Sequence, residues 1–175
     1  STCLSSVDPK PINWLWQGRY PLGKVIIHAG IQGGAKTLQS HDMAARISTG
    51  TPWPDGSPNK AGNVLFMSAE DDLSDTIVPR LQAAGADLSR IFALEMITKV
   101  DPKQGTFHEV MPTITEDLEA IEHEIELHRP RMLVIDPVNA FLPGVDTHRD
   151  AEMRSRVYAP LKRLAEKYEV CIVGI

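Results

Sequence analysis

The sequence predicts an α/β protein built on a mostly parallel sheet with helices on both faces. Two observations support this fold class: short apolar runs typical of buried strands recur along the chain, and segments with helical features separate most of them. Strands that alternate with helices form βαβ units, whose parallel sheet is covered on both sides. The apolar runs lie at residues 24–29, 63–69, 91–94, 132–136 and 170–173.

Composition limits the class of protein further. The chain has 175 residues, of which 42% are hydrophobic and 23% are charged, and its formal net charge is -5. We expect one domain over residues 1–175, with residues 1–23 as an irregular lead-in segment. No apolar run approaches the roughly 20 residues that cross a bilayer, and no signal peptide is visible. The acidic balance disfavours a protein that coats DNA, and the distant Cys3 and Cys171 favour a reducing cytoplasm.

The first predicted unit is a strand, a turn and a helix. The apolar run at 24–29 is closed by Gly30, as expected for a buried strand. A helix is predicted over Lys36–Thr49, because Gly50 is placed to end it. Residues 51–62 contain three prolines and two glycines and predict a surface loop.

The middle of the chain repeats this alternation. The run at 63–69 predicts a second buried strand, and a helix is predicted over residues 74–84 with Gly85 as its stop. A short third strand follows at 91–94. We expect the next helix to use Thr115 as its N-cap.

The last third predicts two helices and two strands. The helix from Thr115 ends at Pro130, and the fourth strand ends at Asp136. A loop is expected over 137–150, followed by a helical segment over 153–168 that Pro160 kinks or splits. The helical periodicity comes from apolar residues three or four apart: Leu118, Ile121 and Ile125, then Met153, Val157, Leu161, Leu164 and Tyr168.

A glycine-rich turn lies between the first strand and the first helix. Residues 30–37 read GIQGGAKT, and the P-loop pattern G-x-x-x-x-G-K-[ST] is met at Gly30, Lys36 and Thr37. Backbone N–H groups of such a turn cradle phosphate oxygens, and the helix N-terminus adds its dipole. Lys36 would meet the β- and γ-phosphates, and the Thr37 hydroxyl would ligate Mg²⁺. The predicted nucleotide-binding residues are Gly30, Gly33, Gly34, Ala35, Lys36, Thr37 and Leu38.

The turn departs from the pattern at Ala35, which stands where the second glycine belongs. If that position needs a positive φ, the strain is on the order of 1 kcal/mol. Gly33 and Gly34 keep the turn adaptable, so binding could survive with weaker affinity or a shifted Lys36. The alternative interpretation is a flexible strand-to-helix turn with an incidental Lys-Thr pair.

Carboxylates follow two of the predicted strands. Asp136 ends the run MLVID and is a candidate for holding Mg²⁺ together with Thr37, although many parallel strands end in an aspartate that caps a loop. Glu70 follows the second strand at the edge where ligands bind, so it could polarise a water that attacks the γ-phosphate. The alternative is that Glu70, Asp71 and Asp72 are acids at a helix N-terminus.

The remaining polar candidates carry weaker signals. His148 and Arg149 lie in the polar loop after Asp136 and could contact nucleic acid or a neighbouring subunit, although a solvated loop and helix cap fits equally well. The histidines form no ligand spacing, so we predict no metal other than Mg²⁺. Nothing in the sequence decides whether the three tryptophans are core or interface residues.

Three motifs in this order carry a family resemblance. GIQGGAKT, then SAEDD, then RPRMLVIDPVNAFL resemble the RecA-like AAA-family P-loop ATPases, and they are most similar to the branch of plasmid RepA and DnaB-type helicases. The stretch WLWQGRYPLGKVIIHAG also resembles the lead-in to that family's phosphate loop. The resemblance covers about Trp14 to Ile175.

The resemblance implies a three-layer αβα RecA-like fold whose fifth strand lies between the first and fourth strands. It implies Lys36 and Thr37 on ATP, Asp136 on Mg²⁺, Glu70 as the catalytic base, and His148 and Arg149 near DNA. Relatives continue past the position of Ile175 into a sensor residue, further strands and an arginine finger, so we expect a chain truncated at its C-terminal end.

The resulting hypothesis is the ATP-binding, Mg²⁺-dependent ATP-hydrolysing core of a DNA helicase or replication-associated ATPase. Its expected partners are ATP, single-stranded DNA and further copies of itself in a hexamer, without a membrane, in the cytoplasm. The alternative is a nucleotide-binding regulatory or assembly module with little or no hydrolysis, which Ala35 and the missing strands favour.

Overall fold

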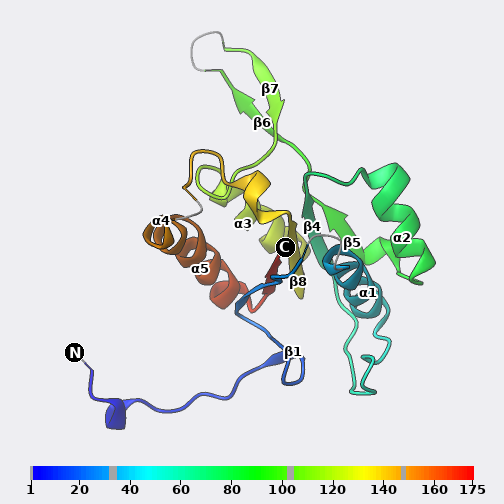
Figure 1. Cartoon of the computed structure of the whole chain (residues 1–175), viewed down its shortest axis with the longest axis vertical. Helices are drawn as coiled ribbons and strands as arrows, with labels where there is room; N and C mark the ends of the chain where they lie inside the picture. The colour runs from blue at the N-terminus through cyan, green and yellow to red at the C-terminus, as the bar shows by residue number, and fades with distance from the viewer. Residues whose placement is uncertain (1, 32–34, 102–104, 147–148) are drawn as a thin grey trace.

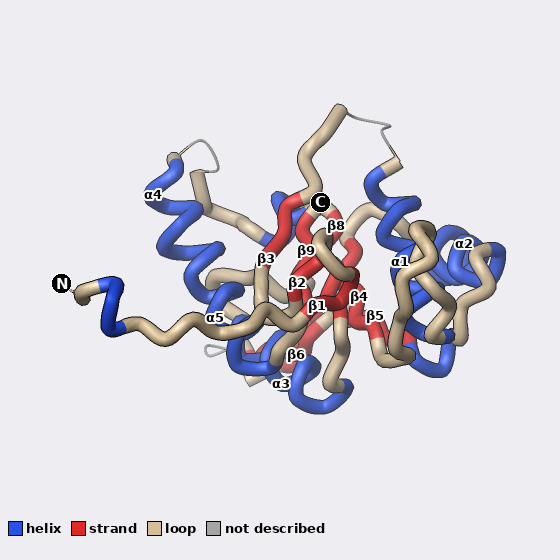
Figure 2. Tube along the Cα trace, turned by 90° about the horizontal axis from the view of Figure 1, so that it is seen from below, coloured by secondary structure: helices blue, strands red, loops and turns tan. Residues whose placement is uncertain are grey.

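A computed structural model describes residues 2–31, 35–101, 105–146 and 149–175 (Figure 1). Within these residues the central sheet has five parallel strands in the order β3-β9-β8-β4-β5. Strand β9 therefore lies between β3 and β8, as the resemblance implied (Figure 2). The strands are β3 (Val25–Ile27), β9 (Cys171–Gly174), β8 (Met132–Asp136), β4 (Val64–Ser68) and β5 (Ile91–Ala93).

Helices cover both faces of this sheet, and each face has its own core (Figure 2). Successive side chains of a strand point to opposite faces, so each central strand serves both cores. Helices α1 (Lys36–Thr49) and α2 (Val78–Ala83) cover one face, and α3 (Leu118–His128) and α5 (Ala159–Tyr168) cover the other. Leu65, Met67, Leu133, Ile135 and Ile172 face α3 and α5, and Val64, Phe66, Met132, Val134, Cys171 and Val173 face α1 and α2. This three-layer α/β arrangement confirms the predicted fold class.

Helix α1 has the predicted bounds. Its C-cap, Gly50, adopts the left-handed conformation with φ 77°, and its N–H donates to the carbonyl of Arg46. A side chain at this position would also meet the backbone N of Ala61 at 3.2 Å. Glycine therefore serves both the backbone turn and the close approach of the following loop.

Two prolines sit in the first turns of helices and follow π-helical turns. Pro79 lies in the first turn of α2, after the π-helical turn Leu73–Ile77. Pro160 lies in the first turn of α5, after the π-helical turn Met153–Tyr158. Proline donates no backbone hydrogen bond and crowds the carbonyl four residues earlier, so a wider turn precedes it. The helix expected to kink or split at Pro160 is not split: a short helix α4 (Asp150–Glu152), the π-helical turn and α5 follow one another without a break.

Several expectations about local structure are wrong. The lead-in segment was expected to be irregular, but it contains the antiparallel pair β1 (Trp14–Trp16) and β2 (Tyr20–Pro21). Helix α3 begins at Leu118 with Asp117 as its N-cap residue, so Thr115 is not the cap. A second hairpin, β6 (Ile97–Val100) and β7 (Phe107–Val110), was not predicted at all.

The side chain of Asp117 holds the segment that precedes α3. Its Oδ2 accepts hydrogen bonds from the backbone N and the hydroxyl of Thr113, and its Oδ1 lies 2.6 Å from Lys99 Nζ. Burial acts to raise the pKa of Asp117, but the hydrogen bonds from Lys99 and Thr113 outweigh it and the pKa is lowered. The carboxylate is thereby held ionised, because its buried charge is paired.

The proline-rich loop 51–62 is pinned to the lead-in segment by aromatic stacking. Trp53 is buried, and its ring lies 4.7 Å from that of Trp16 with an interplanar angle of 2°. Trp16 Nε1 donates to Asp55 Oδ2 at 2.8 Å, and the Arg19 guanidinium lies over the Trp16 ring. Hydrogen bonds from Ser57 and from Trp16 lower the pKa of Asp55 to about 2. Trp16 and Trp53 are thus core residues, a choice the sequence left open.

Within the described residues, no helix has both the length and the apolar character that a membrane crossing requires.

We expect Trp53→Ala to lower the free energy of unfolding by about 3–5 kcal/mol, because it opens a cavity under Trp16. Urea denaturation followed by circular dichroism measures this. The control is Leu127→Ala on α3, whose side chain is exposed and whose loss should change stability by less than about 0.5 kcal/mol. Equal effects of the two substitutions would show that the stacked pair does not hold the loop.

Candidate functional site

The parallel strands bring their carboxyl ends to one edge of the sheet. Strand β3 runs into the turn that begins at Gly30, and β4 and β8 end side by side with Ser68 paired to Asp136. Because β4 and β8 are paired neighbours, the segment after β4 that contains Glu70 begins beside Asp136 at the end of β8. This edge is where open α/β sheets bind ligands.

A hydrogen bond joins the start of α1 to the end of β8. Thr37 Oγ1 donates to Asp136 Oδ2 at 2.7 Å, across 99 residues of sequence. Both residues are half-buried. The structure thus brings together the two residues that the sequence predicted for a metal ion.

Lys36 is folded across the turn. Its Nζ donates to the carbonyls of Ile31 at 2.9 Å and of Gly30 at 3.2 Å. The side chain also borders a cavity of about 420 Å³ at the carboxyl edge of the sheet. The residues lining that cavity are Ala35, Lys36, Thr37, Leu38, Glu70, Asp71 and Arg80. Four predicted nucleotide-binding residues and the predicted base, Glu70, therefore share one hollow.

Ala35 occupies the backbone conformation that the P-loop pattern assigns to glycine. It precedes α1 with φ 58° and ψ 22°, in the left-handed region. A Cβ in this region crowds the following carbonyl, at a cost of about 1–2 kcal/mol. The strain expected at Ala35 for a positive φ is therefore present.

The three acids after β4 have different surroundings. Glu70 is exposed and lines the cavity. Asp71 pairs with Arg80 of α2 at 2.7 Å. Asp72 caps the π-helical turn, because its Oδ1 accepts from the backbone N and the hydroxyl of Ser74, which lowers its pKa. The interpretation as a helix-terminal acid is confirmed for Asp72, whereas Asp71 is half of an ion pair.

Arg80 is a cation in the cavity that sequence reasoning missed. It lies nine residues beyond Asp71 on α2, with no motif around it. The packing of α2 against α1 accompanies its presence in the same hollow as Lys36. Arg80 gives the cavity a second positive charge, paired with Asp71.

Tyr20 was also missed, and it bridges the two ends of the glycine-rich turn. Its hydroxyl lies 2.7 Å from His28 Nε2, before the turn, and accepts a hydrogen bond from Gln39 Nε2 at 3.0 Å, after the turn. Burial lowers the pKa of His28, which favours the neutral ring in this contact. Tyr20 therefore fixes the distance between the strand and the helix that flank the turn.

Some predicted residues are not part of this arrangement. Gly33, Gly34 and His148 lie outside the described residues. Arg149 is exposed, pairs with Asp146 at 3.3 Å, and is not among the residues that line the cavity. His41 is buried in α1 against Phe66, which agrees with the packing role expected for it, and burial lowers its pKa.

The donor set suits a magnesium ion. The described residues include no group of three or more His, Cys, Asp or Glu side chains that could hold a metal by themselves. Mg²⁺ commonly takes only one or two protein oxygens and completes its shell with water and phosphate. The hydroxyl of Thr37 and the carboxylate of Asp136 are two adjacent hard oxygen donors, so they fit this mode.

Comparison with known proteins shows the family. A family model described as an AAA domain matches residues 4–175, so the chain belongs to this family of P-loop ATPases. No match was found among curated proteins. Family membership indicates nucleotide-binding ATPase activity and, with it, the use of a nucleotide and usually Mg²⁺.

We expect Ala35→Gly to raise the free energy of unfolding by about 0.5–1 kcal/mol, because glycine relieves the left-handed strain but adds freedom to the unfolded chain. The control, Ala44→Gly, lies in the interior of α1 and should lower the free energy of unfolding by about 1 kcal/mol. Urea denaturation of both variants measures the difference. A loss of stability in both would mean that Ala35 is not strained.

Proposed function

We propose that this chain is an ATPase core that binds ATP with Mg²⁺ and hydrolyses it, within a helicase or replication-associated assembly. The observation that carries the proposal is the shared cavity of Lys36, Thr37 and Glu70, with Thr37 hydrogen-bonded to Asp136. The hollow thus holds a cation for phosphate, one oxygen donor for a metal ion and a carboxylate for water, and Asp136 adds a second oxygen donor next to Thr37.

Phosphate binding is assigned to the turn, to Lys36 and to the start of α1. A triphosphate would exchange the two carbonyl contacts of Lys36 for charge-assisted hydrogen bonds, which are about twice as strong as neutral ones. The free N–H groups at the N-terminus of α1 add donors and a positive dipole end. Bound Mg²⁺, held by Thr37 and Asp136, would supply charge neutralisation at the β- and γ-phosphates.

Hydrolysis is assigned to Glu70. A catalytic base must lie in the site, within hydrogen-bond distance of the attacking water. Glu70 follows β4 and lines the hollow that Lys36 and Thr37 enter, so its carboxylate can orient a water and accept its proton. Arg80, paired with Asp71, can face the developing charge on the phosphate oxygens.

The role in DNA transactions is the finer part of the proposal, and the RepA and DnaB-type resemblance supports it. It includes single-stranded DNA as a partner, a hexamer as the assembly, the cytoplasm as the location, and His148 and Arg149 in contact with DNA or a neighbour. The alternative function is a nucleotide-binding regulatory or assembly module with little hydrolysis. The observation that favours the alternative is the strained Ala35 beside the phosphate position.

Lys36→Ala should weaken ATP binding at least tenfold, because it removes a charge-assisted contact between an ammonium group and the phosphates. Titration with a fluorescent ATP analogue measures binding. Lys10→Ala, in the lead-in segment, is the matched control and should bind like the wild type. Unchanged affinity and turnover in Lys36→Ala would remove this lysine from the mechanism.

Glu70→Gln separates the two proposed functions. If Glu70 is the base, phosphate release should fall by about 10²–10⁴-fold while ATP binding is kept. Glu119→Gln on α3 is the control and should leave phosphate release unchanged. Tight binding with negligible phosphate release in the wild type, unaffected by Glu70→Gln, would favour the regulatory module.

A further inference from the structure

Two side-chain ties connect the ends of the turn between β3 and α1, and they use different residues. In the first tie, Lys36 Nζ donates to two backbone carbonyls at the start of the turn. In the second, the hydroxyl of Tyr20 lies 2.7 Å from His28 Nε2 and accepts a hydrogen bond from Gln39 Nε2 at 3.0 Å. His28 directly follows β3, and Gln39 lies in the first turn of α1. Tyr20 thus bridges the two elements that flank the turn.

The Tyr20 bridge is independent of the Lys36 tie. A phosphate that binds the turn draws Lys36 away from its carbonyls, so the first tie is given up when the proposed site is loaded. Tyr20, His28 and Gln39 contribute no atom to that exchange. The bridge can therefore still hold the spacing of β3 and α1 while phosphates are bound, which the Lys36 tie cannot do.

Packing fixes the position of the Tyr20 hydroxyl. The Tyr20 ring stacks on Trp16, with centroids 5.9 Å apart and an interplanar angle of 18°, and Trp16 stacks in turn on the buried Trp53. Tyr20 is 7% exposed, and the ring of His28 meets it edge-on at 5.6 Å. A tyrosine has only two side-chain torsions, so a packed ring leaves its hydroxyl little freedom. The lead-in hairpin β1–β2 therefore presents a fixed oxygen to both ends of the turn.

The two partners of this hydroxyl belong to different layers of the fold. The backbone N of His28 donates to the carbonyl of Gly174 at 2.8 Å, which continues the pairing of β3 with β9. His28 Nδ1 is buried and has no hydrogen-bond partner among the described residues, so within them the contact with Tyr20 is what orients the ring by hydrogen bonding. Gln39 moves with α1, whose first turn is also hydrogen-bonded to the end of β8. The bridge thus ties α1 to the sheet at a second strand.

We propose that Tyr20 is a positioning residue, whose hydroxyl holds the end of β3 and the first turn of α1 at the spacing that aligns Lys36 and Thr37 with bound phosphates. Ties to two strands fix both the place and the rotation of that helical turn, whereas a single tie leaves it a pivot. The rate depends on alignment more steeply than affinity does, because a displacement of about 1 Å can cost on the order of 10²-fold in rate. This role rests on the proposed function, because it concerns the same site.

Removal of the hydroxyl tests this role. Tyr20→Phe keeps the stacked ring and deletes the atom that His28 and Gln39 share. In the full chain with ATP and Mg²⁺, kcat for phosphate release should fall about tenfold, while KM changes less than about threefold because Lys36 and the backbone donors remain. Gln39→Leu should have the same effect. The double variant should be no slower than either single variant, because both substitutions break the same bridge.

A conservative replacement separates hydrogen bonding from packing. His28→Leu removes the ring nitrogen, so kcat should fall as it does in Tyr20→Phe. His28→Gln offers an amide oxygen that can accept a hydrogen bond from the Tyr20 hydroxyl, and it should recover most of the kcat that His28→Leu loses. The same recovery should be absent when His28→Gln is combined with Tyr20→Phe, because the hydroxyl is then missing.

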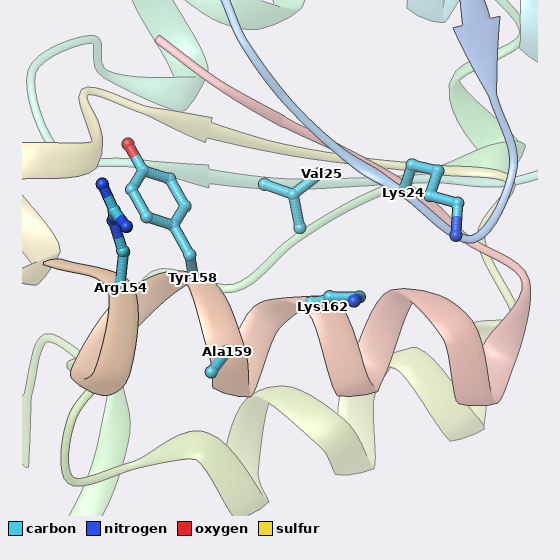
Figure 3. Close-up of a pocket in the computed structure, with 6 residues that line it drawn as sticks. All are labelled: Lys24, Val25, Arg154, Tyr158, Ala159 and Lys162. Atoms are coloured by element: carbon cyan, nitrogen blue, oxygen red, sulfur yellow. The ribbon is translucent and has the colours of Figure 1, made fainter. Parts of the chain in front are cut away.

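Two other tyrosines provide matched controls for the loss of a hydroxyl. Tyr168→Phe removes a hydroxyl that donates to Glu122 at 3.0 Å, between α5 and α3. Tyr158→Phe makes the same change in a cavity of about 380 Å³ between β3 and α5, which Tyr158 lines together with Val25 (Figure 3). Both variants should keep the kcat of the wild type. Tyr168→Phe also controls for the stability that is lost with one side-chain hydrogen bond.

A measurement without nucleotide separates the bridge from the proposed ATPase. A bridge that holds the ends of the turn also helps to keep Ala35 left-handed, so Ala35→Gly should stabilise Tyr20→Phe less than it stabilises the wild type. Urea denaturation of the nucleotide-free wild type, both single variants and the double variant gives this coupling. Coupling in a wild type that does not hydrolyse ATP supports the bridge and contradicts the ATPase. Hydrolysis with an unchanged kcat in Tyr20→Phe, an equal loss of kcat in Tyr168→Phe, or additive effects on stability overturns the bridge and leaves the ATPase in place.

Discussion

The hydrogen bond from Thr37 to Asp136 is the contact on which the geometry of the site depends. It ties the first turn of α1 to the end of β8, and β8 is fixed by burial on both faces and by its register with β4. That register places the segment after β4, with Glu70, beside the same edge. A change in the strand order would separate these groups, because neighbouring strand ends place Glu70 and Asp136 at one edge and the hydrogen bond then holds Thr37 against Asp136.

Burial explains which parts of the fold could be predicted from the sequence. Strands covered on both faces must be apolar throughout, so the runs ending near Ser68 and Asp136 were recognisable. The bounds of α1 followed from local features such as Gly50. The β6–β7 hairpin was missed because its exposed face breaks the usual link between apolar residues and burial. Trp53 was unexpected in the core, since its loop is rich in proline and its stacking partner comes from the distant lead-in segment.

The residues of the candidate site also fall into two groups: those that the sequence singled out and those that it missed. Lys36 and Thr37 were singled out by the P-loop pattern, and Glu70 and Asp136 were singled out because each follows an apolar strand whose carboxyl end faces the ligand edge. Arg80 and Tyr20 reach the site through helix packing and through a side-chain bridge. No spacing rule describes such contacts, because they depend on how whole elements are oriented. The prediction of Thr115 as the N-cap was also wrong. Helix α3 begins at Leu118, so Asp117 is the residue that precedes it.

Side-chain contacts hold the described ends of the turn between β3 and α1 before any phosphate binds. Tyr20 connects His28 with Gln39, Lys36 closes onto the carbonyls of Gly30 and Ile31, and Ala35 is kept in the left-handed region at a cost of about 1–2 kcal/mol. Strain of this size persists only where surrounding contacts determine the backbone. An anion that enters the cavity must therefore draw Lys36 away from two neutral carbonyls. Because a phosphate forms stronger hydrogen bonds to an ammonium group than a carbonyl does, this exchange favours the bound state.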